Sequence, residues 1–171
     1  MPVVHVCPLS RVPQTVAATG ASHLVSLIND GTPVVRPVSI PVERHLFLGI
    51  NDIIEPADGM IAPGEDHVRT LVEFVGGWDR RQPIVIHCYA GISRSTAAAF
   101  ITLCALQPGV DEIDIAYRLR DASPTATPNA RIVDFADGIL RRKGRMTAAI
   151  RAIGRGETAF EGVPFAIPLG A

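Results

Sequence analysis

The residues best suited to chemistry lie in one short stretch, residues 87–95, with the sequence HCYAGISRS. Its reactive groups are the thiol of Cys88 and the guanidinium of Arg94. A thiolate is a strong nucleophile, and a guanidinium can hold two oxygens of a phosphate at once. Gly91, between them, allows backbone conformations that a side chain would forbid. The spacing therefore predicts a nucleophile facing a bound tetrahedral anion such as phosphate.

The elements on either side of this stretch are those that such a site needs. Residues 83–88 are typical of a buried strand, and residues 94–106 form an apolar, Ala-rich helix. A loop that runs from a strand into a helix presents unpaired N–H groups, which bind an anion and stabilise a thiolate. We expect the phosphate-binding residues to be Tyr89, Ala90, Gly91, Ile92, Ser93 and Arg94.

Two neighbours are expected to support this loop. The hydroxyl of Ser95 can donate a hydrogen bond to the sulfur of Cys88 and ease its departure in a second step. His87 is expected to pack under the loop and orient its backbone rather than transfer protons. No spacing of His and Cys is typical of a metal site, so we expect neither a metal nor another cofactor.

The stretch resembles the HC-x5-R-[ST] signature of the cysteine-based protein tyrosine phosphatases, and the chain is most similar to their small dual-specificity group. Residues 20–30 resemble an early strand segment of the family, and residues 45–53 resemble the strand that leads into its general-acid loop. Pro128 and Asn129 are similar to a pair that follows the signature helix, which makes Asn129 a supporting residue. The resemblance spans most of residues 3–140. It implies hydrolysis of phosphomonoesters through a phosphocysteine intermediate, with no metal.

The resemblance also implies a general acid upstream of the cysteine. Asp52 matches that position, at the start of a Pro-, Gly- and Asp-rich loop over residues 51–64. An acid that protonates the leaving oxygen typically contributes about 10²–10⁴-fold to the rate. Asp58 and Asp66 lie in or next to the same loop and stay open as alternatives. The stretch from Asp52 to Cys88 is slightly long for the family, which indicates an enlarged loop.

The expected partner is a phosphorylated protein or a small phosphomonoester. The side chains between Cys88 and Arg94 are uncharged, which argues against a highly anionic phosphoinositide. Nothing matches the recognition loop of the larger tyrosine phosphatases, so we expect a shallow pocket for phosphotyrosine that also admits phosphoserine and phosphothreonine. The alternatives are a silent phosphoprotein-binding module, a lipid phosphatase, and a sulfur-transfer or arsenate-reducing enzyme. The presence of both Cys88 and Asp52 argues against the silent module.

Composition narrows the class of protein further. The chain has 171 residues, 47% of them hydrophobic, and a formal net charge of −1. This excludes a disordered chain and argues against a nucleic-acid binder, which is normally basic. No apolar run reaches the length of a membrane span, and the first residues do not resemble a signal peptide. With three scattered cysteines, we expect a reducing, cytoplasmic location. Arg greatly outnumbers Lys, as is typical of a GC-rich bacterial genome.

The remaining pattern predicts an α/β fold, with a central, mostly parallel sheet of four to five strands flanked by helices in the three-layer arrangement of phosphatases. Further strands are expected at residues 3–7, 23–28 and 45–50. Further helices are expected at residues 10–18, 64–75, 110–122 and 130–143. We expect one phosphatase domain over residues 1–171, with a core of about residues 3–143.

Cys7 and Cys104 fall in apolar runs and are expected in the core, although a disulfide between Cys7 and Cys88 stays open. The C-terminal stretch is basic and is expected to form a solvated helix, with a docking surface for an anionic partner or membrane as the alternative. Its basic residues are Arg141, Arg142, Lys143, Arg145, Arg151 and Arg155. Residues 159–171 are apolar and should pack on the body or on a second subunit, which leaves open an oligomer formed through this tail.

Overall fold

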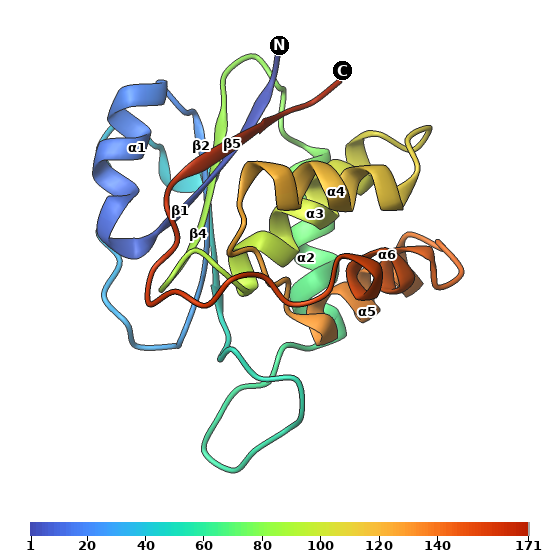
Figure 1. Ribbon diagram of the computed structural model, residues 1–171. Coiled ribbons are helices and arrows are strands. Elements are labelled where there is room, and N and C mark those ends of the chain that lie inside the picture. Colours follow the sequence, from blue (N-terminus) through green and yellow to red (C-terminus); the bar gives the residue numbers. More distant parts are fainter. Residues whose placement is uncertain (171) are drawn as a thin grey trace.

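The computed structural model describes residues 1–170, so the last residue of the predicted tail, Ala171, lies outside the described residues. Five strands form one sheet in the order β3-β2-β4-β1-β5 (Figure 1). The first four run parallel, and β5 pairs antiparallel with β1 at one edge. The strands are β1 (Val3–Pro8), β2 (His23–Ile28), β3 (His45–Gly49), β4 (Ile84–Cys88) and β5 (Phe165–Pro168). The predicted α/β fold with a mostly parallel sheet is confirmed.

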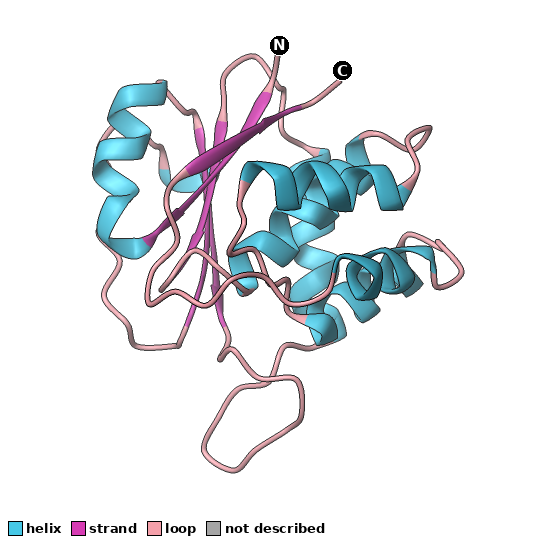
Figure 2. Cartoon of the chain, in the orientation of Figure 1, coloured by secondary structure: helices cyan, strands magenta, loops and turns pink. Residues whose placement is uncertain are grey.

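Helices cover both faces of the sheet, which gives three layers (Figure 2). Helix α1 lies on one face, and the other five helices lie on the opposite face. The helices are α1 (Val12–Thr19), α2 (Glu65–Gly76), α3 (Arg94–Leu106), α4 (Glu112–Ala122), α5 (Ala130–Ile139) and α6 (Arg145–Ile153). Short 3-10 turns at Leu9–Arg11 and Val42–Arg44 precede α1 and β3.

The two central strands carry the long apolar runs of the sequence because both of their faces are covered. Every residue of β2 and β4 is buried. On the α1 face, Cys7 and Val85 pack with Val12 and Val16. On the other face, β4 packs against α3, which is buried from Arg94 to Cys104. The sheet therefore holds the end of β4 and the start of α3 rigidly together.

Some element boundaries differ from those expected. The helix predicted over residues 130–143 ends at Ile139, because Arg141 and Lys143 both have φ of 55°, which no helix accommodates. The helix predicted over residues 10–18 starts at Val12, after the 3-10 turn, and ends at Thr19, where Gly20 caps it with φ of 65°. The loop between β3 and α2 extends away from the body (Figure 1).

The C-terminal tail packs on the body of its own chain. β5 pairs with β1 in a register that sets Val4 opposite Ile167 and His5 opposite Ala166. The side chains of Ile167 and Leu169 are buried in the core. Of the two expected packing partners of the tail, residues 165–169 therefore contact the body of their own chain.

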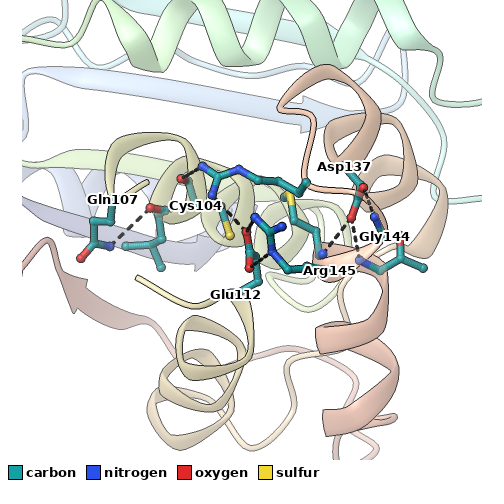
Figure 3. A network of polar contacts seen from close by, with 10 residues as sticks. Cys104, Gln107, Glu112, Asp137, Gly144 and Arg145 are labelled. Carbon is teal, nitrogen blue, oxygen red and sulfur yellow. Dashed lines mark hydrogen bonds and ion pairs between the residues drawn. The ribbon is translucent and has the colours of Figure 1, made fainter. Parts of the chain in front are cut away.

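The basic segment around α6 is only partly solvated, contrary to the expected solvated helix, because Arg142 is buried while Arg145 and Arg151 are exposed. Figure 3 shows the network of polar contacts around Glu112 and Arg145. The buried carboxylate of Glu112 binds Arg142 at 3.0 Å and Arg145 at 2.9 Å. Arg142 also donates to the carbonyl of Cys104 at 2.8 Å. Burial alone would raise the pKa of Glu112, but its hydrogen bonds and the two guanidinium charges outweigh burial and lower it. Two of the basic residues therefore anchor α6 to α3 and α4.

All three cysteines are free and buried. Burial raises the pKa of Cys7 to about 11 and that of Cys104 to about 12, so both thiols stay protonated. Cys7 faces α1, whereas Cys88 contacts Ser95 of α3 on the opposite face. A disulfide between Cys7 and Cys88 would need backbone movement, because their side chains point to different sides of the sheet. No helix within residues 1–170 is both long and apolar enough to cross a membrane.

Candidate active site

Cys88 is the last residue of β4, and its side chain is 2% exposed. Its Sγ lies 3.1 Å from Ser95 Oγ and 3.3 Å from the backbone N of Gly91, whose N–H donates to the sulfur. Both groups come from the loop and helix that follow the strand. Each can donate a hydrogen bond to the sulfur of Cys88.

The carbonyls of the loop are held from outside by three separate parts of the chain. The three hydrogen bonds join Leu9 N to Tyr89 O at 3.1 Å, Gly162 N to Ala90 O at 2.8 Å, and Thr127 N to Ile92 O at 2.9 Å. In a planar trans peptide, the C=O and the following N–H point in opposite directions. Each tether therefore turns the next N–H of the loop toward the inside, as seen directly for the N–H that meets the sulfur.

Gly91 is required by the space around it as well as by its backbone. Its φ is 71°, in the left-handed region. A Cβ at this position would lie 2.8 Å from the N of Pro8 and 2.9 Å from the C of Cys7. The loop thus packs directly against the end of β1, where no side chain fits.

Arg94 begins α3, and its guanidinium contacts the residues that directly follow β2 and β3. Its Nη1 donates to Asn29 Oδ1 at 2.7 Å and to the carbonyl of Ile50 at 2.8 Å. Its Nε is buried, and none of the described residues accepts a hydrogen bond from it. Nη1 of the guanidinium is therefore fixed by two protein acceptors, while Nε has no acceptor among the described residues. An unpartnered buried donor is costly, and a bound oxyanion would remove that cost.

Asp52 lies in the loop after β3 and is held over the start of α3 and α5. Its Oδ1 accepts hydrogen bonds from Ser93 Oγ at 2.7 Å and from Asn129 Nδ2 at 2.9 Å. Asp52, Arg94 and Tyr89 line one cavity of about 420 Å³. Neither Asp58 nor Asp66 lines this cavity, and Asp66 lies in the first turn of α2. Of the three candidate acids, Asp52 is the one that lines this cavity with Arg94.

Asn129 links the carboxylate of Asp52 to the N-terminus of α5. Its Oδ1 caps α5 by accepting from the N of Ile132 at 3.1 Å, and its Nδ2 donates to Asp52. The side chain is buried, 4% exposed, so the amide is held in one orientation by both contacts. The structure therefore brings Asn129 to the site.

His87 lies beneath the loop in a chain of hydrogen bonds. Its Nδ1 is 3.2 Å from the carbonyl of Cys88, its Nε2 is 2.6 Å from Ser26 Oγ, and that oxygen is 2.8 Å from His45 Nε2. Burial lowers the pKa of His87 to about 4, so the ring is neutral at pH 7.

The directions of these hydrogen bonds follow from the neutral ring. A carbonyl can only accept, so Nδ1 of His87 carries the hydrogen and its Nε2 accepts from Ser26. The oxygen of Ser26 then accepts from His45. His87 thus orients the carbonyl at Cys88, and the chain of bonds orients His87.

Asn29, Ser26 and Gly162 are among the residues of the site that the sequence did not predict. A signal existed for Asn29, because it follows β2 directly and the carboxyl ends of parallel strands meet at one edge of a sheet. Ser26 points toward its partner because it is paired with His87 in the register of β2 and β4. Nothing local marks Gly162, which reaches the loop from a distant part of the chain.

The residues that the structure describes include no group of three or more His, Cys, Asp or Glu side chains that could hold a metal ion. The site does bring together the thiol of Cys88, the inward-facing amides of the loop, the guanidinium of Arg94 with its unpaired Nε, and the carboxyl group of Asp52. This set can bind a tetrahedral oxyanion, attack its central atom and protonate an oxygen that leaves.

Comparison with known proteins is informative at the level of the fold. The chain matches no protein-family model and no curated protein. It is similar to the crystal structure of DUSP15, at 17% identity and a TM-score of 0.59, over 91% of this chain and 94% of that one. It is similar to the human tyrosine phosphatase-like serine/threonine/tyrosine-interacting protein, at 19% identity and a TM-score of 0.62, over 82% and 92%.

A third similar structure is PTPMT1 in complex with PI(5)P, at 13% identity and a TM-score of 0.57, over 81% of this chain and 91% of that one. The chain therefore has the fold of the small dual-specificity phosphatases.

Proposed function

We propose that the protein hydrolyses phosphomonoesters in the manner of the tyrosine and dual-specificity phosphatases, through a phosphocysteine intermediate. The observation that carries the proposal is the loop at the end of β4. There the sulfur of Cys88 accepts from the N–H of Gly91, while the buried Nε of Arg94 has no acceptor among the described residues. A phosphate seated in the loop would meet the amides and the guanidinium together and would place phosphorus beside the sulfur.

In the first step, the thiolate of Cys88 attacks phosphorus, and the bond from phosphorus to the leaving oxygen breaks. Arg94 and the inward-facing amides bind the other oxygens of the phosphate, where charge must be stabilised. Asp52 gives its proton to the leaving oxygen. Its Oδ1 is occupied by Ser93 and Asn129, so Oδ2 is the oxygen that carries the proton.

In the second step, a water molecule attacks phosphorus, the bond from sulfur to phosphorus breaks, and inorganic phosphate forms. Asp52, now ionised, accepts a proton from that water. Ser95 donates to the departing sulfur, from which its Oγ lies 3.1 Å away in the free protein. The cycle needs a reduced thiol, which fits the proposed cytoplasmic location, and it calls for no metal ion or other cofactor.

The proposed substrates are phosphorylated tyrosine, serine and threonine side chains. Tyr89 and Met60, both half exposed, line the cavity beside Arg94 and can contact the group that bears the phosphate. A lipid substrate is the second candidate, because PTPMT1, similar in fold, has been solved with PI(5)P. It is less favoured because the loop side chains between Cys88 and Arg94 carry no charge to bind further phosphates.

The test is hydrolysis of para-nitrophenyl phosphate near pH 6 in the presence of a chelator and a reductant. We expect turnover by the wild type, none by Cys88→Ser, and wild-type turnover by the matched control Cys104→Ala, which removes a core thiol from α3. Asp52→Asn should lower kcat by about 10²–10⁴-fold for a substrate with a poor leaving group.

Two outcomes would overturn the proposal. Folded, reduced wild type that binds phosphopeptides but turns over neither them nor para-nitrophenyl phosphate would be a phosphoprotein-binding module. Turnover that survives in Cys88→Ser would exclude the phosphocysteine mechanism.

A further inference from the structure

A second groove, of about 500 Å³, begins at the proposed general acid and leads away from it. Asp52 and Ser93 line its inner end, and Arg151 and Arg155 line it together with residues 157–159. Ile92, Pro128 and Ile150 give it apolar walls. The groove is therefore continuous with the site, apolar along its walls and positively charged at the residues that α6 and its C-terminal extension supply.

The wall that carries these arginines is built in the free protein. At the start of α6, Asp137 accepts from the N of Gly144 at 2.7 Å and of Met146 at 2.8 Å, beside the network of Glu112 (Figure 3). At its end, Arg120 donates to the carbonyls of Ile153 at 2.8 Å and Gly154 at 2.7 Å. Both ends of α6 are thus held in place.

The segment after α6 is held just as closely against the loop before α5. The N of Gly156 donates to Thr127 Oγ1 at 3.1 Å, and the N of Glu157 donates to the carbonyl of Pro124 at 2.9 Å. A Cβ on Gly156 would lie 2.6 Å from the carbonyl carbon of Thr125, so this residue leaves no gap. A groove with such walls needs little reordering to bind a partner, which lowers the cost of binding.

The two arginines of the groove differ from those that anchor α6. Arg142 and Arg145 are paired with Glu112, whereas Arg151 and Arg155 are exposed and form no ion pair or side-chain hydrogen bond with any described residue. The carboxylates that line the groove are Asp52, already bound by Ser93 and Asn129, and Glu157. The outer part of the groove therefore has positive charge available for an anionic partner.

We propose that this groove binds the peptide segment next to the phosphorylated residue of a protein substrate, and that Arg151 and Arg155 bind an acidic side chain of that segment. The inference rests on the proposed function, since it places the substrate's phosphate in the loop at Cys88. A peptide fits the combination of apolar walls and two separate cations, because its backbone and apolar side chains cover the walls. An inositol ring with several phosphates would need cations along its whole length, and the walls offer none at Ile92 and Pro128.

The test measures binding rather than turnover, so that its failure and the failure of the proposed function can be told apart. Fluorescence anisotropy is recorded for the Cys88→Ser protein with two phosphotyrosine peptides, one with Glu on both sides of the phosphotyrosine and one with Gln at the same positions. The same peptides are titrated into Cys88→Ser carrying Arg151→Ala and Arg155→Ala. The matched control carries Arg80→Ala and Arg81→Ala, which remove two exposed charges from the loop before β4.

We expect the Glu peptide to bind more tightly than the Gln peptide by about three- to tenfold, the range for two exposed ion pairs. Arg151→Ala with Arg155→Ala should abolish this preference, and the Arg80 and Arg81 control should keep it. The preference should shrink as salt is raised, because the pairs are exposed.

Equal binding of the two peptides, or a preference that survives the loss of both arginines, would overturn the inference. It would also be overturned, in favour of a lipid surface, if vesicles containing phosphatidylinositol 5-phosphate bound in a way that needs the two arginines while the Glu peptide had no advantage. If the wild type did not turn over para-nitrophenyl phosphate but the preference for the Glu peptide remained, the result would contradict the proposed function and leave the peptide-binding inference standing.

Discussion

Replacement of Gly162 by Ala should loosen the phosphate-binding loop from behind. The N–H of Gly162 holds the carbonyl of Ala90 at 2.8 Å, and the same peptide unit presents the N–H of Gly91 to the sulfur of Cys88. A Cβ on Gly162 would lie 2.9 Å from the carbonyl oxygen of Gly91, and 3.4 Å from Ala90 O. Contacts below 3.0 Å are too close for a real Cβ, so the segment must shift away from the loop.

The expected size of the effect follows from these contacts. Overpacking of this kind costs about 1–3 kcal/mol of folding free energy, and a lost tether about 1 kcal/mol. A loop amide that no longer points at the sulfur stabilises the thiolate and the transition state less. If about 1 kcal/mol of the loss is felt in the transition state, kcat/KM falls about fivefold. The melting temperature should fall by several degrees, at about 2–4 °C per kcal/mol for a chain of this size.

The assay is kcat/KM for para-nitrophenyl phosphate together with thermal unfolding followed by circular dichroism. Gly109→Ala is the matched control, because a Cβ on Gly109 meets nothing within 4 Å. We expect Gly109→Ala to equal the wild type and Gly162→Ala to lose both activity and stability. Wild-type kcat/KM in Gly162→Ala, with or without a lower melting temperature, would refute the argument that Gly162 orders the loop.

Two further substitutions test the support of the site. Because the pKa of His87 is about 4 in the folded protein, against 6.5 for an unperturbed ring, the unfolded state binds the extra proton between these values. The free energy of unfolding should therefore fall, by up to about 3 kcal/mol from this ring, as the pH falls from about 6.5 to 4. In urea unfolding, His87→Gln should lose less free energy of unfolding over that pH range than the wild type does. An equal loss in the two proteins would contradict the lowered pKa of His87. Asn129→Asp keeps the oxygen that caps α5 but removes the donor to the general acid, so kcat should fall about tenfold or more while the melting temperature changes little. A variant with wild-type kcat would show that this donor does not position the acid.

Much of the fold could be predicted from the sequence because its signals are local. The run over residues 23–28 and the run that ends at Cys88 are buried on both sides, and such strands stand out by composition alone. β5 could not be found in this way, because a strand of four residues that ends in Pro168 carries no periodicity. Its strand character comes from pairing with β1, which lies at the other end of the described chain.

The same distinction applies to the site. The loop from Cys88 to Arg94 could be located because its chemistry is contiguous in sequence. Which aspartate joins it could not be decided from residue types, since Asp58 lies in the same loop as Asp52. The choice depends on where Ser93 and Asn129 hold a carboxylate, and that is a property of the packed helices.

The hydrogen bond from Gly162 to Ala90 also affects when, during synthesis of the chain, the phosphate-binding loop can reach its final shape. The ribosome makes residues 87–95 well before residue 162, and chains begin to fold while they are still being synthesised. A nascent chain that has folded strands β1 to β4 and helices α1 to α6 would carry the thiol and the guanidinium with one of the three outer carbonyl contacts, that of Gly162, still missing. Completion of the loop then waits for the segment after α6, so this loop reaches its final shape only after residue 162 has been made.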